Sequence, residues 1–168
     1  MRWRGMDEHC DILIIGGGMA GLSAVTALSA SGLRTIVLDK GRGPGGRMAA
    51  RRAEIAGETV GFDHGAQYFT ARDPAFREKV AEWEAAGVAA RWPAAGDEAW
   101  VGTPGMNACV KAMAETQDVR WGVRAERLER TPEGWRVDSG EQTFAAAGVL
   151  VAIPAEQATV LLAEVASG

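Results

Sequence analysis

The 168-residue sequence has few of the residues that mark a metal centre, a disulfide scaffold or a membrane span. Its two cysteines, Cys10 and Cys109, lie far apart and outside any CxxC or metal-ligand spacing. No metal site is therefore expected, and Cys109, on an apolar helical face, is expected to be a small buried side chain. No apolar run approaches the length of a transmembrane helix.

An excess of charge of one sign is also lacking, since 18 basic and 22 acidic residues leave a net charge of −4. Such a balance indicates neither a nucleic-acid partner nor a polybasic membrane patch. Residues 1–10 contain basic side chains but no hydrophobic stretch, so they do not read as a signal peptide and are expected to form a flexible tail. The sequence thus predicts a cytoplasmic protein.

Glycine is abundant, and its arrangement carries the most information. The apolar run 12–15 has the character of a buried parallel strand, and Gly16, Gly18 and Gly21 follow it as G-x-G-x-x-G. Gly16 permits the tight turn, Gly18 has no Cβ to block a pyrophosphate, and Gly21 lets the next helix lie close to the sheet. This pattern predicts a dinucleotide-binding loop.

The helix expected after this loop begins near Met19 and Ala20, where unpaired N–H groups would face the phosphates. Ala24 and Leu28 are expected to continue the sheet-facing stripe that starts at the last glycine of the motif. Gly32 is a plausible end of the helix.

A second strand is expected to end at Asp39, 18 residues beyond Gly21, where a carboxylate can accept hydrogen bonds from ribose hydroxyls. A carboxylate there would repel a ribose 2′-phosphate, so NADP is disfavoured, although Lys40 and Arg42 could soften that repulsion. The alternative is a glycine-rich turn in another kind of α/β protein, with Asp39 a solvated strand end.

A second glycine-rich loop, KGRGPGGR, follows at once and ends with Gly45, Gly46 and Arg47. Two backbone-rich loops around one strand suit a long cofactor with two phosphates, and the sequence therefore predicts FAD. A simple turn at Gly45–Gly46 remains the alternative.

The rest of the chain completes an α/β pattern. Helices are expected to begin at 73–74 and at 103–104. A strand over 119–123, extended pieces near 123–130, 134–138 and 142–145, and a buried strand over 148–153 are also expected. A parallel sheet interrupted by an antiparallel meander resembles the Rossmann-like FAD-binding domain of the glutathione-reductase type.

Four separated motifs are similar to the renalase-like branch of the flavin-containing amine oxidase superfamily. They are DKGRGPGGRMAARR (39–52), FDHGAQYFTARDP (62–74), WVGTPGMN (100–107) and GVLVAIPAEQA (148–158). The similarity extends from residue 11 to about residue 162.

The resemblance implies FAD-binding roles for residues in four segments. The first loop and the end of the second strand would hold the ADP half, 45–48 would approach the pyrophosphate and ribityl chain, 65–67 would lie along the isoalloxazine ring, and 123–124 would approach the adenine. The residues implied are Gly16, Gly18, Met19, Ala20, Gly21, Asp39, Lys40, Gly46, Arg47, Met48, Gly65, Ala66, Gln67 and Val123.

No catalytic residue is assigned. His64 could act as a general base beside the flavin, but a structural role is favoured because no partner carboxylate stands at a telling spacing. The flavin itself performs the hard chemistry in such enzymes.

Members of this family are about twice as long, and their later half contains a Gly-Asp pair that helps to complete the flavin site. Gly96-Asp97 lies in a predicted loop and does not fit that role. We therefore expect an N-terminal half, with residues 11–168 forming the FAD domain and 71–102 beginning an inserted substrate domain. An unpaired sheet edge would then favour self-association.

The sequence predicts an FAD-dependent oxidoreductase, renalase-like or amine oxidase-like, that transfers hydride from an amine or a dihydronicotinamide to the flavin. The alternative is a truncated nucleotide-binding module that holds the ADP half of FAD without catalysis of its own. An NAD-dependent dehydrogenase is disfavoured by the second loop and the meander.

Overall fold

The computed structural model describes residues 8–140, 142–163 and 165, and the chain divides into two compact units. The first unit comprises Met1–Gly43 and Thr116–Gly168, and the second comprises Pro44–Glu115. Each unit is described by itself.

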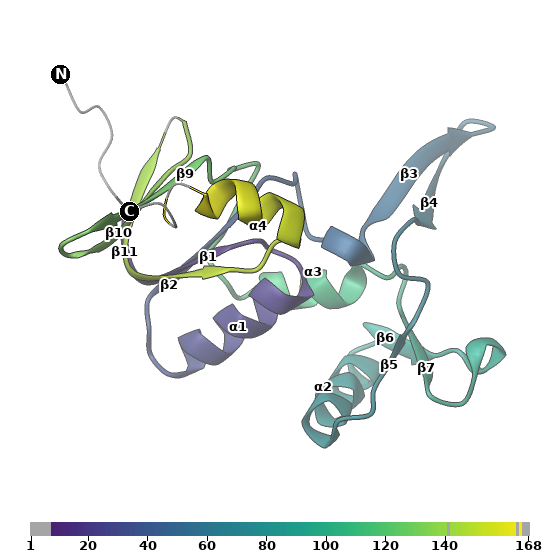
Figure 1. Cartoon of the computed structure of the whole chain (residues 1–168). Coiled ribbons are helices and arrows are strands. Elements are labelled where there is room, and N and C mark those ends of the chain that lie inside the picture. Colours follow the sequence, from purple (N-terminus) through teal and green to yellow (C-terminus); the bar gives the residue numbers. More distant parts are fainter. Residues whose placement is uncertain (1–7, 141, 164, 166–168) are drawn as a thin grey trace. The chain divides into compact units, whose positions relative to one another are not determined.

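The first unit is built on a six-stranded sheet with the strand order β8-β2-β1-β11-β10-β9 (Figure 1). Strands β8, β2, β1 and β11 are parallel, and β10 and β9 are antiparallel to their neighbours. Their bounds are β1 Glu8–Ile15, β2 Thr35–Asp39, β8 Val119–Trp121, β9 Arg127–Thr131, β10 Gly134–Asp138 and β11 Thr143–Val151. The predicted α/β class, a Rossmann-like parallel sheet with an antiparallel meander, is confirmed.

Both faces of β1 are buried, as its apolar run predicts. Leu13 points into a core that also holds Phe144 of β11 and Leu161 of helix α4 (Ala155–Leu162). Ile14 points to the opposite face. There its Cγ2 atom lies only 3.3 Å from the position that a Cβ on Gly21 of α1 (Met19–Ala30) would take. The two helices therefore cover opposite faces of the sheet.

Strand β11 replaces two separately predicted pieces, 142–145 and 148–153, by one continuous strand. It pairs with β10 along Thr143–Ala146 and with β1 from Phe144 to Val151. Gly148 lies within the strand and pairs with Ile12 of β1, so the glycine does not end the strand.

Helix α1 ends at Ala30, and Gly32 follows with φ +81°, as predicted. Its buried stripe differs from the prediction, since Leu22 and Val25 are buried whereas Ala24 and Leu28 are only half-buried. Because Gly21 packs closely on the loop, the side chains of Leu22 and Val25, next to the predicted stripe, face the sheet.

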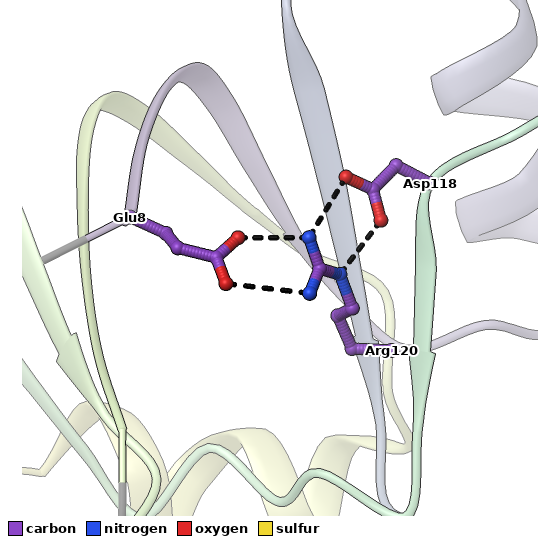
Figure 2. A network of polar contacts seen from close by, with 3 residues as sticks. All are labelled: Glu8, Asp118 and Arg120. Atoms are coloured by element: carbon purple, nitrogen blue, oxygen red, sulfur yellow. Dashed lines mark hydrogen bonds and ion pairs between the residues drawn. The ribbon is translucent and has the colours of Figure 1, made fainter. Parts of the chain in front are cut away.

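Strand β1 begins at Glu8, so the expected flexible tail is wrong for residues 8–10, and residues 1–7 lie outside the described residues. A polar network holds this start of the strand (Figure 2). Arg120 of β8 donates to both carboxylate oxygens of Glu8, at 3.3 and 2.8 Å, and to both of Asp118, at 2.7 and 3.1 Å. Both neighbouring carboxylates raise the pKa of Arg120. The network joins the first residue of β1 to β8.

The second unit contains two small sheets and two helices. One sheet is the hairpin of β3 (Ala50–Ile55) and β4 (Glu58–Asp63), and the other has the order β5-β7-β6. The remaining elements are β5 Phe69–Thr70, α2 Pro74–Ala85, β6 Ala89–Arg91, β7 Ala99–Gly102 and α3 Ala108–Ala114, with short 3-10 turns at Gly46–Met48 and Pro93–Ala95. The expected inserted segment, 71–102, lies within this unit, whose bounds are wider.

Helix α2 begins where the sequence predicts, because the Asp73 side chain accepts a hydrogen bond from the Phe76 N–H at 3.0 Å. Helix α3 begins at Ala108 rather than at 103–104. The carboxylate of Asp63 accepts the Met106 N–H at 2.9 Å, which keeps the preceding residues in a turn. None of the helices in the described part of the chain has the length and apolar character needed to cross a membrane.

Candidate functional site

The glycine motif forms a tight loop between β1 and α1. Gly16 has φ +113°, and a Cβ there would lie 2.5 Å from the Ala152 carbonyl oxygen. A Cβ on Gly21 would overlap the Gly16 carbonyl oxygen. The structure shows the tight turn predicted at Gly16. Gly21 was predicted to let the helix lie close to the sheet, and a Cβ there would lie 3.3 Å from Ile14 Cγ2 of β1.

Gly18 lies at the N-terminus of α1 in a different environment. It is the N-cap residue, with extended backbone angles of φ −83° and ψ −174°, and no side chain caps the helix. A Cβ on Gly18 would meet no atom within 4 Å. Glycine is therefore not required here by the packing of the protein, and the open space lies beside N–H groups that have no intrahelical partner.

Met19 and Ala20 form the first turn of α1 directly after this space, and Met19 is half-buried while Ala20 is exposed. Their backbone N–H groups are among those that a helix N-terminus offers to an anion. Their position in the first turn of α1 is as expected, and their contact with a cofactor stays a prediction.

Asp39, at the end of β2, joins the first loop to the second. Its Oδ2 atom accepts the Gly17 N–H at 2.6 Å, and its Oδ1 atom accepts the Gly41 N–H at 2.7 Å. The carboxylate is thus held in one orientation at the carboxyl edge of the sheet. Each oxygen has a second lone pair, so the group can still accept a ribose hydroxyl.

The segment after β8 lies against the same edge. The Gly122 N–H donates to the Gly41 carbonyl at 2.7 Å, and the Val123 N–H donates to the Asp39 carbonyl at 3.0 Å. Residue 123 follows β8 and does not begin a meander strand, since β9 starts at Arg127. An adenine contact through the Val123 backbone would have to use its carbonyl.

Sequence reasoning missed Gly17, Gly41 and Trp121. A Cβ on Gly17 would lie 2.9 Å from Trp121 Cζ3, so the indole packs directly on the loop. One signal was available: Trp121 ends a predicted strand, and carboxyl ends of neighbouring parallel strands meet at one edge of a sheet. The register pairs Trp121 with Asp39.

The Lys40 side chain has a structural partner. Its Nζ atom donates to Oε1 of Gln157 at 2.9 Å, which ties the end of β2 to helix α4. Any contact of this ammonium with a phosphate would compete with that hydrogen bond.

In the second unit, the structure brings together two segments that are far apart in the sequence. The Ala66 N–H donates to the Arg47 carbonyl at 2.7 Å, and a Cβ on Gly65 would overlap the same carbonyl oxygen. Gly46 opens the 3-10 turn with φ +55°, Met48 is buried, and the residues Arg47 and Gln67 are exposed. Arg47 therefore leaves a guanidinium available on the surface of this unit.

Other candidate groups lack the chemistry of a reactive centre. Residue His64 is exposed, and its backbone N–H donates to the Ala49 carbonyl at 3.3 Å. Burial raises the pKa of both Cys10 and Cys109 to about 11, so neither thiol is ionised near neutral pH. Cys109 is fully buried, as predicted. Among the described residues, no group of three His, Cys, Asp or Glu side chains could hold a metal ion.

Comparison with known proteins shows relatives with the same kind of fold. Residues 14–83 match a family described as an NAD(P)-binding Rossmann-like domain. Sarcosine oxidase subunit alpha of Rhizobium meliloti (strain 1021) is 42% identical over 52 residues, which is 31% of this chain and 5% of that protein.

Solved structures share the fold along most of the chain. A protein of Exiguobacterium sp. 255-15 described as a protoporphyrinogen oxidase aligns with a TM-score of 0.68 and 12% identity, over 96% of this chain and 62% of that one. A putrescine oxidase variant aligns with a TM-score of 0.61 and 14% identity, over 93% of this chain and 60% of that one. The chain thus spans less than two thirds of the length of these relatives. The predicted Rossmann-like fold is thus confirmed, and solved structures that share it include a putrescine oxidase and a protein described as a protoporphyrinogen oxidase.

Proposed function

We propose that this chain binds FAD and forms the dinucleotide-binding part of a flavin-dependent oxidoreductase of the renalase-like or amine oxidase-like kind. One observation carries the proposal: Gly18 opens onto free space at the N-terminus of α1, beside a loop that the Asp39 carboxylate already holds in place. A phosphate fits that space because it needs N–H donors and no competing Cβ. The residues present therefore fit the cofactor.

Several features favour FAD over NADP. The fixed carboxylate of Asp39 would repel a ribose 2′-phosphate. The meander of β9, β10 and the first half of β11 is the feature that separates the predicted FAD domain from a plain dehydrogenase domain. The neighbouring structures named as oxidases support the same choice.

The chain's own groups would bind and orient the cofactor. The N-terminus of α1 would stabilise the negative charge of the pyrophosphate, and Asp39 would fix the adenosine ribose. Bound FAD would supply acceptance of a hydride from an amine or a dihydronicotinamide substrate. No residue of this chain is assigned a role in breaking the substrate C–H bond.

A second candidate function is a nucleotide-binding module that holds FAD through its ADP half without turnover. The observation that favours it is that the groups proposed to hold the ADP half, namely the first glycine loop, the N-terminus of α1 and Asp39, all belong to one compact unit. Both candidates predict binding of FAD, and only the first predicts its reduction by a substrate.

The binding proposal is tested by titrating the cofactor-free protein with FAD and comparing two matched variants. Asp39→Asn replaces one acceptor oxygen by an NH₂ group that cannot accept the Gly17 or Gly41 N–H, and the FAD affinity should fall at least tenfold. Asp11→Asn is the control, because Asp11 Oδ2 accepts the Arg34 N–H at 2.8 Å at the opposite end of β2. The control should bind FAD like the unchanged protein. Equal affinities for all three proteins would contradict the proposed role of Asp39.

Turnover is tested separately by mixing the FAD-loaded protein with dihydronicotinamides or amines without oxygen. Loss of the flavin absorption band supports the oxidoreductase, and recovery of the band on admitting air identifies oxygen as an acceptor. A band that never bleaches leaves the module as the function of this chain.

A further inference from the structure

Trp121, at the end of β8, lies beside the two residues that join the first glycine loop to β2. It is paired with Asp39 in the register of β8 and β2, so the two side chains lie on the same face of the sheet. Gly17, which donates its N–H to the Asp39 carboxylate, lies against both. All three residues belong to the first unit, which therefore holds the whole arrangement.

The backbone of Gly17 is confined between the indole and the Asp39 side chain. A Cβ on Gly17 would lie 2.9 Å from Trp121 Cζ3, 3.0 Å from Trp121 Cη2 and 3.1 Å from Asp39 Cβ. The far edge of the six-membered ring is thus in direct contact with the Gly17 backbone. Gly17 does not have a positive φ, so a side chain is excluded here by contact and not by the backbone angle.

This confinement acts on the Asp39 carboxylate through the Gly17 N–H. Oδ2 accepts that N–H at 2.6 Å, whereas Oδ1 accepts the Gly41 N–H at 2.7 Å. The Gly41 side is fixed by a further main-chain hydrogen bond, since the Gly122 N–H donates to the Gly41 carbonyl at 2.7 Å. On the Gly17 side the indole contact has the corresponding place. With a smaller side chain at position 121, Gly17 has space to move away and Oδ2 loses its fixed orientation.

The geometry points to Trp121 as a positioning residue for nucleotide binding: its indole holds the Gly17 N–H against Asp39 and so keeps the carboxylate oriented toward a ribose hydroxyl. The inference rests on the proposed function, because it takes Asp39 as the group that receives the ribose. A hydrogen bond from a hydroxyl to a carboxylate is strong when the acceptor oxygen is well aligned. No contact between the indole and the nucleotide is required.

Trp121→Phe tests the inference, because a phenyl ring keeps an aromatic side chain in β8 but lacks the atoms that reach Gly17. Calorimetric titration measures the affinity of the cofactor-free protein for ADP and for 2′-deoxy-ADP. The unchanged protein should prefer ADP about tenfold, as expected for one hydrogen bond to a charged group. In Trp121→Phe this preference should fall to about threefold or less, because a misaligned hydrogen bond is weak.

Trp135→Phe is the matched control. It makes the same change at another half-buried tryptophan of the same sheet, in β10. Trp135 pairs with Ala146 of β11, which pairs in turn with Cys10, at the end of β1 away from the glycine loop. This variant should keep the full preference for ADP.

Gly17→Ala is a second test that leaves β8 unchanged. Its methyl group would be forced between the indole and Asp39, so the Gly17 peptide would have to move. The preference for ADP should therefore fall in this variant as well. Circular dichroism verifies that each variant is folded.

Hydrogen exchange of backbone amides, followed by NMR, tests the positioning without a ligand. In Trp121→Phe the Gly17 N–H should exchange about tenfold faster. The Gly16 N–H, which donates to the Leu38 carbonyl at 2.8 Å, should keep its rate. An equal acceleration of both amides would indicate general loosening of the loop and would overturn the inference.

The titrations separate failure of this inference from failure of the proposed function. Absence of ADP binding by the unchanged protein contradicts the proposed function and, with it, the role of Trp121. If the unchanged protein prefers ADP and Trp121→Phe keeps that preference, the inference alone is overturned. An equal loss of affinity for ADP and 2′-deoxy-ADP also overturns it, because a merely structural role would weaken both alike.

Discussion

Gly18 is the N-cap of α1 and Gly21 lies in its first turn, three residues further on, and the structure predicts opposite consequences for a methyl group at each. At Gly21 a Cβ would overlap the Gly16 carbonyl oxygen and lie 3.3 Å from Ile14 Cγ2. At Gly18 a Cβ would meet no protein atom within 4 Å. Gly21→Ala should therefore damage the fold, and Gly18→Ala should damage binding alone.

The size of the folding effect follows from the overlap at Gly21. Because backbone rather than a flexible side chain is in the way, the helix or the loop must move, which costs about 3 kcal/mol, the upper end of the usual range for overpacking. The better helix propensity of alanine offsets about 1 kcal/mol of this. The net loss of about 2 kcal/mol should lower Tm by roughly 4–8 °C in a chain of this size.

The size of the binding effect follows from the open space at Gly18. The backbone angles of φ −83° and ψ −174° are allowed for alanine, so the loss of the preferred N-cap glycine should cost at most about 1 kcal/mol. The added methyl would occupy the space assigned to a phosphate, and FAD affinity should fall at least tenfold, or about 1.4 kcal/mol.

Thermal unfolding followed by circular dichroism and calorimetric titration with FAD measure the two effects on the same samples. Gly18→Ala with unchanged FAD affinity would refute the assignment of this space to a phosphate. Gly21→Ala with unchanged Tm would refute the close packing of α1 on the loop.

Two further predictions concern stability. Arg120→Met removes the hydrogen bonds to Glu8 and Asp118 but keeps the aliphatic stem. Because these side chains are a third to a half exposed, the free energy of unfolding should fall by only about 1 kcal/mol, and by less in high salt. No change in Tm at low salt would contradict a structural role for the network. Folding raises the pKa values of Cys10 and Cys109 from 9.0 to about 11, so the unfolded chain loses its thiol protons at lower pH than the folded chain. The free energy of unfolding should therefore fall as the pH rises from about 9 to about 11, by at most about 3 kcal/mol per cysteine. Urea titrations at several pH values should show a smaller fall for Cys109→Ala, and identical pH dependence of the two proteins would count against burial as the cause.

Local chemistry made much of the nucleotide loop predictable. Gly16 and Gly21 have roles that one backbone turn and one helix contact dictate, and the structure shows both contacts. Asp39 was predictable because it ends a strand at a known distance from the glycines. The end of α1 before Gly32 and the start of α2 at Asp73 were predictable for the same reason, since capping depends on a few adjacent residues.

Features that depend on distant partners were not predictable. The start of β1 depends on Arg120, which is more than a hundred residues away, and the late start of α3 depends on Asp63. Trp121 could be placed on the loop only once its strand had been paired with β2. The merging of two predicted pieces into β11 depends on its pairing with both β1 and β10, which no local pattern reveals.

The first glycine loop is proposed to hold FAD through its ADP half. Its most direct test is a calorimetric titration of the folded, cofactor-free protein with FAD, ADP and FMN in separate experiments. We expect saturable binding of FAD and of ADP with one site each, mutual competition between them, and much weaker binding of FMN, which lacks the adenosine. A folded protein that binds neither FAD nor ADP would contradict it.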